Sequence, residues 1–543
     1  MNKRTKRKKS NIIQSTLFML AGLLGLIRQI PLTGMIGDDG NAYYAAAFEI
    51  CMVFLLLTSY CLPEAVAGMI EARISKEQYI NAGRVLKAAF FFLGMLSIVG
   101  GAFLVLAAQI LAEDFMKEPL CMYALRAFAP VLLLVTAAGT LRGFFQGMGT
   151  RVPTAVSRLL EELVLLITVL LFANLLSEYG QSVGQLLKNK HFRAAYGSMG
   201  AAAGISAGMI AGVLFLFFVY RIYRRVYKKQ EQKDPTKNPE SYGQLIKILV
   251  WTAVPLIVPG LLYYLSHIFE QALFNRYMIE NGMEEMRAVT WGVYFGKYRV
   301  LTRIPVVEAI AVGLPMISGI VSAIGKSDYK QAKDRMQTIL HLIAFLTLPW
   351  CMFLGVLAKP VTELLYNGET ETAISLLRTG SLMPLLLAAA ILTNGILQGI
   401  ERSQFVMRNV LVAFVIQMGF FYVSLQYLGL GVHAAVYAEM LGTFILFLLN
   451  LWSAGRILRY RQEWVRTFVV PLIASAGMGV AEYLLFIGFS RLMGNLAVLP
   501  VMLLGAVLYL VAVLALHGIS EKELSRIPFG ELIRKAAKAA KLL

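Results

Sequence analysis

The chain has 543 residues, of which 58% are hydrophobic and only 15% are charged. A soluble protein carries about 25% charged residues, so this composition excludes a soluble protein and indicates an integral membrane protein. Lys and Arg outnumber Asp and Glu by 51 to 32, and in a membrane protein such a surplus marks cytoplasmic loops rather than nucleic-acid binding. The four cysteines lie in apolar segments without CxxC spacing, which argues against disulfide or metal roles. They are Cys51, Cys61, Cys121 and Cys351.

Apolar stretches long enough to cross a bilayer recur along the whole chain. A membrane-spanning helix needs roughly 20 apolar residues, and we count fourteen such stretches. Several are interrupted by Gly, Pro or ionisable residues, which is typical of helices that line a polar cavity. The predicted helices start near Asn11, Tyr43, Ala82, Leu120, Thr154, Ala194, Gln244, Trp291, Ala332, Ala373, Val406, Val432, Thr467 and Leu496.

The positions of the basic residues support this number of helices. If the N-terminus is cytoplasmic, 37 of the 51 Lys and Arg residues fall in cytoplasmic segments, and eight fall in the loops on the opposite side. Cytoplasmic loops of membrane proteins carry such an excess. We therefore predict a multi-pass membrane protein with both termini in the cytoplasm.

The two ends of the chain also favour a membrane location. The apolar run behind the basic residues 1–10 is too long for a signal-peptide core, so we expect a retained first helix. The segment 519–543 places apolar residues opposite lysines, which is typical of an amphipathic helix on an anionic inner leaflet. A solubilising tail is the alternative interpretation of this segment.

The chain contains an internal repeat. Residues 125–147 align without gaps on residues 377–399, with nine identities in 23 positions and an offset of 252 residues. The same offset carries Leu62-Pro63 onto Leu314-Pro315. Because this period spans six predicted helices, an even number, the two copies have the same orientation in the membrane. Parallel repeats of this kind occur in transporters, whose substrate site lies between the halves.

These observations predict an all-α polytopic membrane protein of about 14 transmembrane helices, with two parallel six-helix lobes followed by two C-terminal helices. The Pro and charge content of the segment between the lobes is typical of a mobile connection. The predicted divisions are a basic cytoplasmic N-terminus (1–10), an N-lobe (11–227), a cytoplasmic linker (228–243), a C-lobe (244–460), the last two helices (461–518) and an amphipathic cytoplasmic tail (519–543).

Several ionisable residues lie deep within predicted helices. A cation at mid-bilayer costs about 2.5–3.5 kcal/mol on insertion scales and usually faces a cavity or a partner. Arg28 lies in the first helix, and Lys297, Arg299 and Arg303 cluster in the eighth. The repeat offset places Glu49 at the equivalent of position 301, so we expect these groups to face each other between the halves. Because Arg binds phosphate and diphosphate well, the pattern predicts a cationic pocket for an anionic substrate.

Other buried charges have simpler explanations. Arg126 and Arg378 are equivalent in the repeat and lie close enough to the outer surface to extend their guanidinium groups to it. Glu161 and Glu162 lie three and four residues from Arg158, so a local ion pair is the default interpretation.

The sequence gives no sign of catalysis. His267 and Glu270 lie one helical turn apart and are candidates for coupling transport to H+ or Na+, but satisfied interior polar groups explain them equally well. The sequence has no Walker A, HExxH or GxSxG motif. We therefore expect no enzyme activity, no metal site and no cofactor.

Three segments resemble a known family: GLIRQIPLTGMIGDDGNAYYAAAFEI, LPEAVAGMI and RAFAPVLLLVTAAGTLRGFFQGMGTRVPTAVSRLLEE. They resemble the polysaccharide-biosynthesis and stage V sporulation protein B group. That group shares an exporter superfamily with MurJ-type lipid II flippases, Wzx-type oligosaccharide flippases and multidrug-and-toxin extruders (MATE). The most specific match is an Arg-Gly-aromatic-aromatic-Gln-Gly run followed by Pro-Thr-Ala-x-Ser-x-x-x-Glu. It covers Arg142–Gly147, Pro153–Ala155, Ser157 and Glu161.

The resemblance implies two six-helix lobes around a central cavity, and alternating access that moves an undecaprenyl-linked sugar precursor, with lipid II as one candidate, to the outer leaflet. It also implies cavity arginines, and Arg28 and either Arg299 or Arg303 match those positions. Asn41 stands where MurJ-like members have an acid. The candidate gating motif comprises Arg142, Gln146, Glu161 and Gln398.

Our interpretation is therefore a flippase of the bacterial inner (plasma) membrane. Its expected partners are a polyprenyl-linked glycan, membrane lipids and the glycosyltransferases or polymerases of the same pathway. A MATE-like cation-coupled drug antiporter is the alternative, although it would be expected to have an acidic cavity. A membrane-embedded transferase and a scaffold with a non-functional cavity are rivals from other classes. The candidate substrate-binding residues are Arg28, Arg299, Arg303, Lys297, Glu49 and Asn41, and the candidate coupling residues are His267 and Glu270.

Overall fold

The computed structural model describes residues 3–60, 62–236, 238–366, 368, 370–460, 462–516, 518–519, 523 and 534, with side chains from Leu17 onward except those of Phe18 and residues 59–62. Every regular element in these ranges is helical. Within them, 11 helices are long and apolar enough to cross a membrane, or 12 if one bent pair counts as a single span. The prediction of an all-α membrane protein is confirmed. Most of the predicted amphipathic tail, 519–543, lies outside the described residues.

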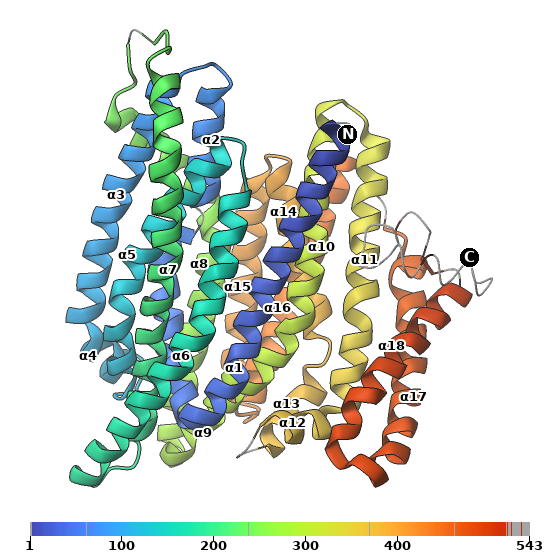
Figure 1. Ribbon diagram of the computed structural model, residues 1–543. Helices are drawn as coiled ribbons and strands as arrows, with labels where there is room; N and C mark the ends of the chain where they lie inside the picture. Colours follow the sequence, from blue (N-terminus) through green and yellow to red (C-terminus); the bar gives the residue numbers. More distant parts are fainter. Residues whose placement is uncertain are drawn as a thin grey trace. The chain divides into compact units, whose positions relative to one another are not determined.

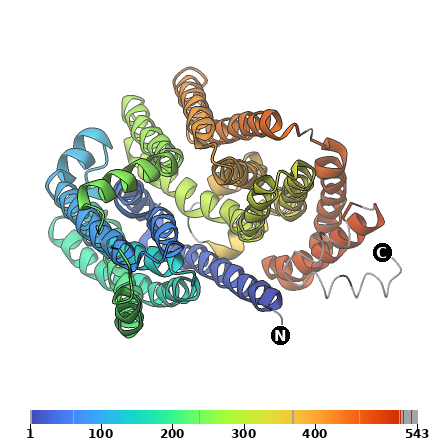
Figure 2. The same cartoon turned by 90° about the horizontal axis from the view of Figure 1, so that it is seen from above.

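The chain separates into two compact units, residues 1–296 and residues 297–543. In the first unit, long helices pack side by side, with α6 and α5 both against α7 (Figure 1), and Figure 2 shows them nearly end-on. The helices α8 and α9, which the sequence assigns to the C-lobe, belong to this unit, and the predicted lobe limits stay predictions. Its elements are α1 (Lys3–Leu55), η1 (Leu56–Tyr60), α2 (Leu62–Ile74), α3 (Tyr79–Leu106), α4 (Ala108–Ile110), η2 (Leu111–Phe115), α5 (Cys121–Gly147), α6 (Val152–Leu186), α7 (Phe192–Glu231), α8 (Tyr242–Glu280) and α9 (Glu284–Val293).

The second unit is built around α11, which packs against α10, α14 and α17. The π-helical turn η3 (Tyr294–Tyr298) crosses the boundary between the two units. The remaining elements are α10 (Arg299–Gly325), α11 (Tyr329–Val356), α12 (Ala358–Leu365), α13 (Glu371–Thr379), α14 (Met383–Gly399), α15 (Ser403–Gln426), α16 (His433–Leu458), η4 (Val465–Val469), α17 (Val470–Met493), η5 (Gly494–Ala497) and α18 (Val498–Ala515).

The first two predicted helices are joined by a kink inside α1. Gly37 has φ 75° and ψ 174°, a conformation that side chains disfavour. Just beyond the kink, the backbone of α1 is in close contact with α9, because a Cβ on Gly292 would lie 1.7 Å from the carbonyl oxygen of Asp38. A glycine at each of these positions allows the chain to bend and the two helices to meet.

Part of the predicted linker is tied to the first unit. Arg73, at the end of α2, donates from Nε to Oε1 of Glu240 at 3.1 Å, and the amide of Glu240 donates to Oδ1 of Asn81 at 2.9 Å. The amide of Ile80 donates to the carboxylate of Asp234. Side chains on both sides of the α2–α3 turn therefore hold the end of this segment in place.

Glycines on α7 let this helix pack closely on α6. A Cβ on Gly200 would lie 2.3 Å from the carbonyl oxygen of Phe172, and one on Gly204 would lie 2.5 Å from the Cα atom of Val169. Lipid does not drive helices together by the hydrophobic effect, so close van der Waals contact through small residues has to stabilise the pair.

We expect Gly204→Leu to lower the free energy of unfolding by about 1–3 kcal/mol, because the added side chain cannot fit without separating α6 from α7. Gly94→Leu is the matched control, since a Cβ at Gly94 on α3 meets nothing within 4 Å. Thermal unfolding in detergent measures the difference. Equal melting temperatures for the two variants would contradict this packing.

The internal repeat seen in the sequence recurs in the backbone. Gly149 and Glu401, which are 252 residues apart, both have positive φ, at 82° and 60°. In each turn the amide N–H of that residue donates to the carbonyl oxygen of the residue three positions earlier. The distance is 2.9 Å at Gly149 and 3.0 Å at Glu401. A second pair, Glu77 and Ser327, which are 250 residues apart and so need a two-residue shift from that offset, share φ 58°. The repeat thus covers loop geometry that residue identities alone reveal only in part.

Candidate functional site

Arg28 has an acidic partner within the first unit. Its Nη1 atom on α1 lies 3.0 Å from Oε2 of Glu162 on α6, and both side chains are largely buried. The sequence suggested Arg158 as the local partner of Glu162, and the structure adds a partner on another helix. The charge of Arg28 is therefore balanced in this conformation, and an anionic ligand would have to compete with Glu162 for it.

The candidate gating motif links α5 to α6. The buried guanidinium of Arg142 donates from Nε to Oγ of Ser157 at 3.1 Å and forms an ion pair with Glu161. One turn further along, Gln146 donates from Nε2 to Oγ1 of Thr154 at 3.5 Å. The structure thus brings together three of the four residues proposed for this motif. The fourth, Gln398, lies in the second unit, where its carbonyl accepts the amide of Glu401.

The second unit carries neutral side chains at the equivalent positions. The repeat offset relates Arg142 to Asn394 and Ser157 to Asn409. Asn450 on α16 joins them, because its Nδ2 donates to Asn394 at 2.7 Å and its Oδ1 accepts from Asn409 at 3.0 Å. The sequence analysis missed this network, although applying the repeat offset to Arg142 and Ser157 would have identified two of its members.

We expect Glu161→Gln to destabilise the protein by about 3–5 kcal/mol, because it leaves the Arg142 charge buried without its partner. The double variant Arg142→Gln/Glu161→Gln should lose less than the sum of the two single changes. A double-mutant cycle on thermal unfolding measures the coupling. Glu178→Gln, an exposed site on the same helix, is the control. Additive losses would show that this pair does not join α5 to α6.

The cations of the eighth predicted helix lie on η3 and α10. Lys297 is fully buried in η3, with Nζ 6.0 Å from the ring centroid of Tyr366, and Arg299 is buried at the start of α10. Nη2 of Arg303, one turn further along, lies 2.9 Å from Oε1 of Glu439 on α16. Three cations thus follow one another within two turns, next to a π-helical segment of the kind often found at functional sites.

Asn41 has a structural role at the kink of α1. This fully buried amide donates from Nδ2 to the carbonyl oxygen of Gly37 at 2.8 Å, and its Oδ1 accepts from Nε2 of Gln29 at 3.0 Å. Thr33 donates to the carbonyl oxygen of Gly296 at 3.3 Å. An amide can both donate to the kink and accept from Gln29, whereas a carboxylate can only accept.

The candidate coupling pair is fully buried in α8. Nδ1 of His267 lies 3.3 Å from Oε2 of Glu270. The ring of Tyr263 packs edge-on against the imidazole, with 4.7 Å between the two ring centroids. Glu49 on α1 is also fully buried. Arg28, Asn41 and Glu49 belong to the first unit and the three α10-region cations to the second, so their convergence on one substrate stays a prediction.

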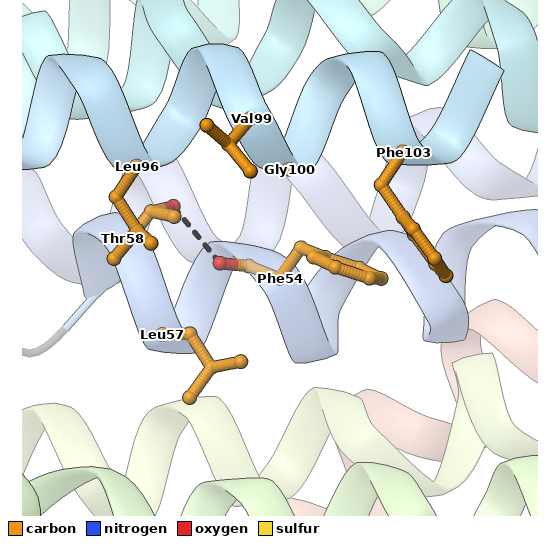
Figure 3. Close-up of a pocket in the computed structure, with 7 residues that line it drawn as sticks. All are labelled: Phe54, Leu57, Thr58, Leu96, Val99, Gly100 and Phe103. Carbon is orange, nitrogen blue, oxygen red and sulfur yellow. Dashed lines mark hydrogen bonds between the residues drawn. The ribbon is translucent and has the colours of Figure 1, made fainter. Parts of the chain in front are cut away.

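An apolar cavity of about 260 Å³ lies between η1 and α3 in the first unit (Figure 3). The hydroxyl of Thr58 donates to the carbonyl oxygen of Phe54 at 2.9 Å, so the wall is almost entirely hydrocarbon. Such a cavity suits an acyl or prenyl chain rather than a sugar or phosphate. It is lined by Phe54, Leu57, Thr58, Leu96, Val99, Gly100 and Phe103.

A buried ion pair ties the loop before α5 to α9. Glu118 accepts from Nε and Nη2 of Arg287 at 3.1 and 3.3 Å. Nearby, Asn275 on α8 donates to the carbonyl oxygen of Met116 at 2.8 Å. Burial raises the pKa of Glu118 to about 7, and the Arg287 guanidinium opposes that rise. This carboxyl therefore changes charge in the physiological pH range.

The folded protein holds the Glu118 proton more tightly than an unfolded chain, in which a glutamate has a pKa near 4.5. The stability that this group contributes is complete below that pKa and is lost as the pH rises through about 7. We expect Glu118→Gln to reduce the fall in melting temperature between about pH 5 and pH 8. Glu113→Gln, at an exposed glutamate nearby, should leave the fall unchanged. An equal fall in melting temperature in Glu118→Gln and Glu113→Gln would contradict the raised pKa assigned to Glu118.

Within the described ranges, no three His, Cys, Asp or Glu side chains are grouped in a way that could hold a metal ion. Among the candidate side chains, Arg28 and Arg303 form ion pairs and Asn41 forms amide hydrogen bonds. Groups of this kind can exchange one hydrogen-bond partner for another.

Comparison with solved structures identifies the fold. The chain matches the inward-facing conformation of a multidrug resistance MATE family transporter of the MOP superfamily with a TM-score of 0.64 and 18% identity, over 83% of this chain and 99% of that one. A crystal structure of MATE in the straight conformation gives a TM-score of 0.60. At this level of identity, the likeness shows a shared transporter fold.

The family follows from the sequence comparison. The model of the polysaccharide biosynthesis protein family matches residues 8–321, and the chain belongs to that family. It is 25% identical over 490 residues to the lipid II flippase MurJ of Bacillus subtilis (strain 168), covering 87% of this chain and 88% of that protein. It is 22% identical over 536 residues to the stage V sporulation protein B of the same organism, covering 97% and 99%. The resemblance noted in the sequence is confirmed.

Proposed function

We propose that this protein moves a polyprenyl-diphosphate-linked sugar precursor, lipid II among the candidates, from the inner to the outer leaflet of the bacterial plasma membrane by alternating access. The observation that carries the proposal is the row of cations on η3 and α10, where Lys297 and Arg299 are buried within a membrane-spanning segment. Buried cations in such a helix bind anionic groups, and Arg matches the geometry of phosphate oxygens. The family supports the saccharide part of the substrate.

The proposal includes fourteen membrane crossings. The helical stretch Met19–Ile74 has 56 residues, and Val465–Ala515 has 51. At 1.5 Å per residue, each is more than twice the roughly 30 Å thickness of the hydrocarbon core. Breaks at Gly37 and Gly494 would turn each stretch into two crossings, and the bent pair α13–α14 would supply one more. The excess of cytoplasmic Lys and Arg supports placing both termini in the cytoplasm.

In this proposal the diphosphate is bound by cations that already have acidic partners. Arg28 would exchange Glu162 for the substrate, and Arg303 would exchange Glu439, so that the charge of each cation is balanced both with and without substrate. Asn41 and Glu49 would help to position the head group. The pair His267 and Glu270 would couple transport to an ion, and the glycosyltransferases or polymerases of the pathway would supply and take up the lipid.

We expect Arg299→Ala to reduce translocation by at least tenfold while leaving the fold intact, because a buried cation that binds diphosphate is lost. Arg378→Ala is the matched control, since Arg378 is an exposed arginine on α13 and is not one of the cations on η3 and α10. The assay reconstitutes the protein in liposomes with fluorescent undecaprenyl-diphosphate sugars and measures their protection from an external quencher. Arg28→Ala and Arg303→Ala are tested in parallel.

Full activity of the triple variant Arg28→Ala/Arg299→Ala/Arg303→Ala would overturn the assigned pocket. A MATE-like antiporter is the second candidate, and it is favoured by the fold and by the buried His267–Glu270 pair. An antiporter would move organic cations in exchange for H+ or Na+, and Glu270→Gln would abolish that exchange. Export of cations without movement of the lipid-linked sugar would select this second function.

A further inference from the structure

A carboxyl group lies buried in the middle of the C-terminal helix hairpin. Glu482 is on α17, which forms a hairpin with α18 (Figure 1), and it is 1% exposed. A Cβ on Gly505 of α18 would lie 2.2 Å from Oε1 of Glu482. The carboxyl therefore occupies the space that the missing side chain at position 505 leaves open.

The surroundings of this carboxyl are apolar. The whole of α18 contains no Asp, Glu, Lys, Arg or His, and the hydroxyl of its Tyr509 donates to the carbonyl oxygen of Phe345 at 2.8 Å. On α17, the hydroxyl of Ser475 donates to the carbonyl oxygen of Pro471 at 2.7 Å. Arg491 is nine residues away, or about 13 Å along the helix. In the part of the chain that the structure describes, Oε2 of Glu482 has no hydrogen-bond partner.

The third helix that packs here also brings no charge to the site. One turn before Glu482, Gly479 faces Val356 and Met352 of α11. The titratable groups of α11 toward its other end include His341, whose Nδ1 lies 3.0 Å from Glu523. None of the three helices therefore offers Glu482 a cation in the described structure.

An ionised carboxylate in such a place would be very costly, because neither lipid nor apolar side chains solvate it. A metal cation would not relieve this cost, since Na+ or Ca2+ needs several oxygen ligands and the site offers one carboxyl. A proton relieves it completely. The ligand that fits the site is therefore H+.

We propose that Glu482 is a proton-binding site in the α17–α18 hairpin, and that loading and unloading this proton is coupled to transport. The coupling rests on the proposed function, whereas the proton site does not. A protonated carboxyl is stable against Gly505, and its ionisation requires the two helices to part and admit water. Proton release and separation of α17 from α18 are then one event.

Infrared spectroscopy on the purified, reconstituted protein tests the proton site directly. We expect the wild-type protein near pH 7 to show a protonated-carboxyl carbonyl band that Glu482→Gln lacks. The matched control is Glu308→Gln on α10, another membrane glutamate, whose Oε2 accepts from Nε1 of Trp350 at 3.2 Å. This control should retain the Glu482 band. Identical carbonyl spectra for wild type and Glu482→Gln would overturn the proton site.

The quencher assay for lipid-linked sugars, run at about pH 6 and pH 8, tests the coupling. In the wild type we expect the transport rate to differ between the two pH values, and we expect Glu482→Gln to reduce that difference, with the remainder due to Glu118 and the His267–Glu270 pair. Gly505→Ala, which crowds the carboxyl, should slow transport without removing the infrared band. An unchanged difference in Glu482→Gln would overturn the coupling. Failure of the wild type to move any lipid-linked sugar would overturn the proposed function and the coupling with it, while the infrared result would stand alone.

Discussion

The buried ion pair of Arg142 and Glu161 shows the constraint on which much of this structure depends, which is that charge within a membrane must be matched inside the protein. Lipid offers no hydrogen bonds and little solvation, so an unmatched charge is expensive. Arg142 reaches Ser157 and Glu161 across the α5–α6 contact, and Arg28 reaches Glu162 on the same helix. Two adjacent carboxylates of α6 therefore pair with two neighbouring helices, α1 and α5. The sequence alone shows only that two acidic residues follow each other.

The same requirement links the fold to the proposed transport cycle. A cation that is already paired is stable in the membrane, and a ligand with stronger or more numerous acceptor oxygens can take the place of its partner. Arg303 with Glu439 and Arg28 with Glu162 have this arrangement, one in each unit. A diphosphate would offer several acceptor oxygens in place of one carboxylate. If it binds one conformation more tightly than the other, this difference in binding free energy shifts the protein toward that conformation.

The sequence predicted the features that depend on composition and periodicity. Its apolar stretches predicted an all-helical membrane protein, and its 252-residue offset relates Gly149 to Glu401, where the backbone repeats a turn. It could not predict that Glu161 pairs with Arg142, because the two residues are 19 positions apart on different helices and only packing brings them together. It also missed the amide network at Asn450 and the carboxyl of Glu482, since neither has a local signature and both depend on contacts between distant helices.

The differences between the two repeats bear on the mechanism more than their similarities do. At equivalent positions the first unit has Arg142 and Ser157 and the second has Asn394 and Asn409. A buried ion pair is costly to open, because separation leaves two unsolvated charges, whereas amides can exchange hydrogen-bond partners at lower cost. Two copies of one architecture can therefore differ in stiffness without differing in fold. Rearrangement inside the second unit should therefore be easier, and three of the four cations proposed to bind the diphosphate, Lys297, Arg299 and Arg303, lie in that unit.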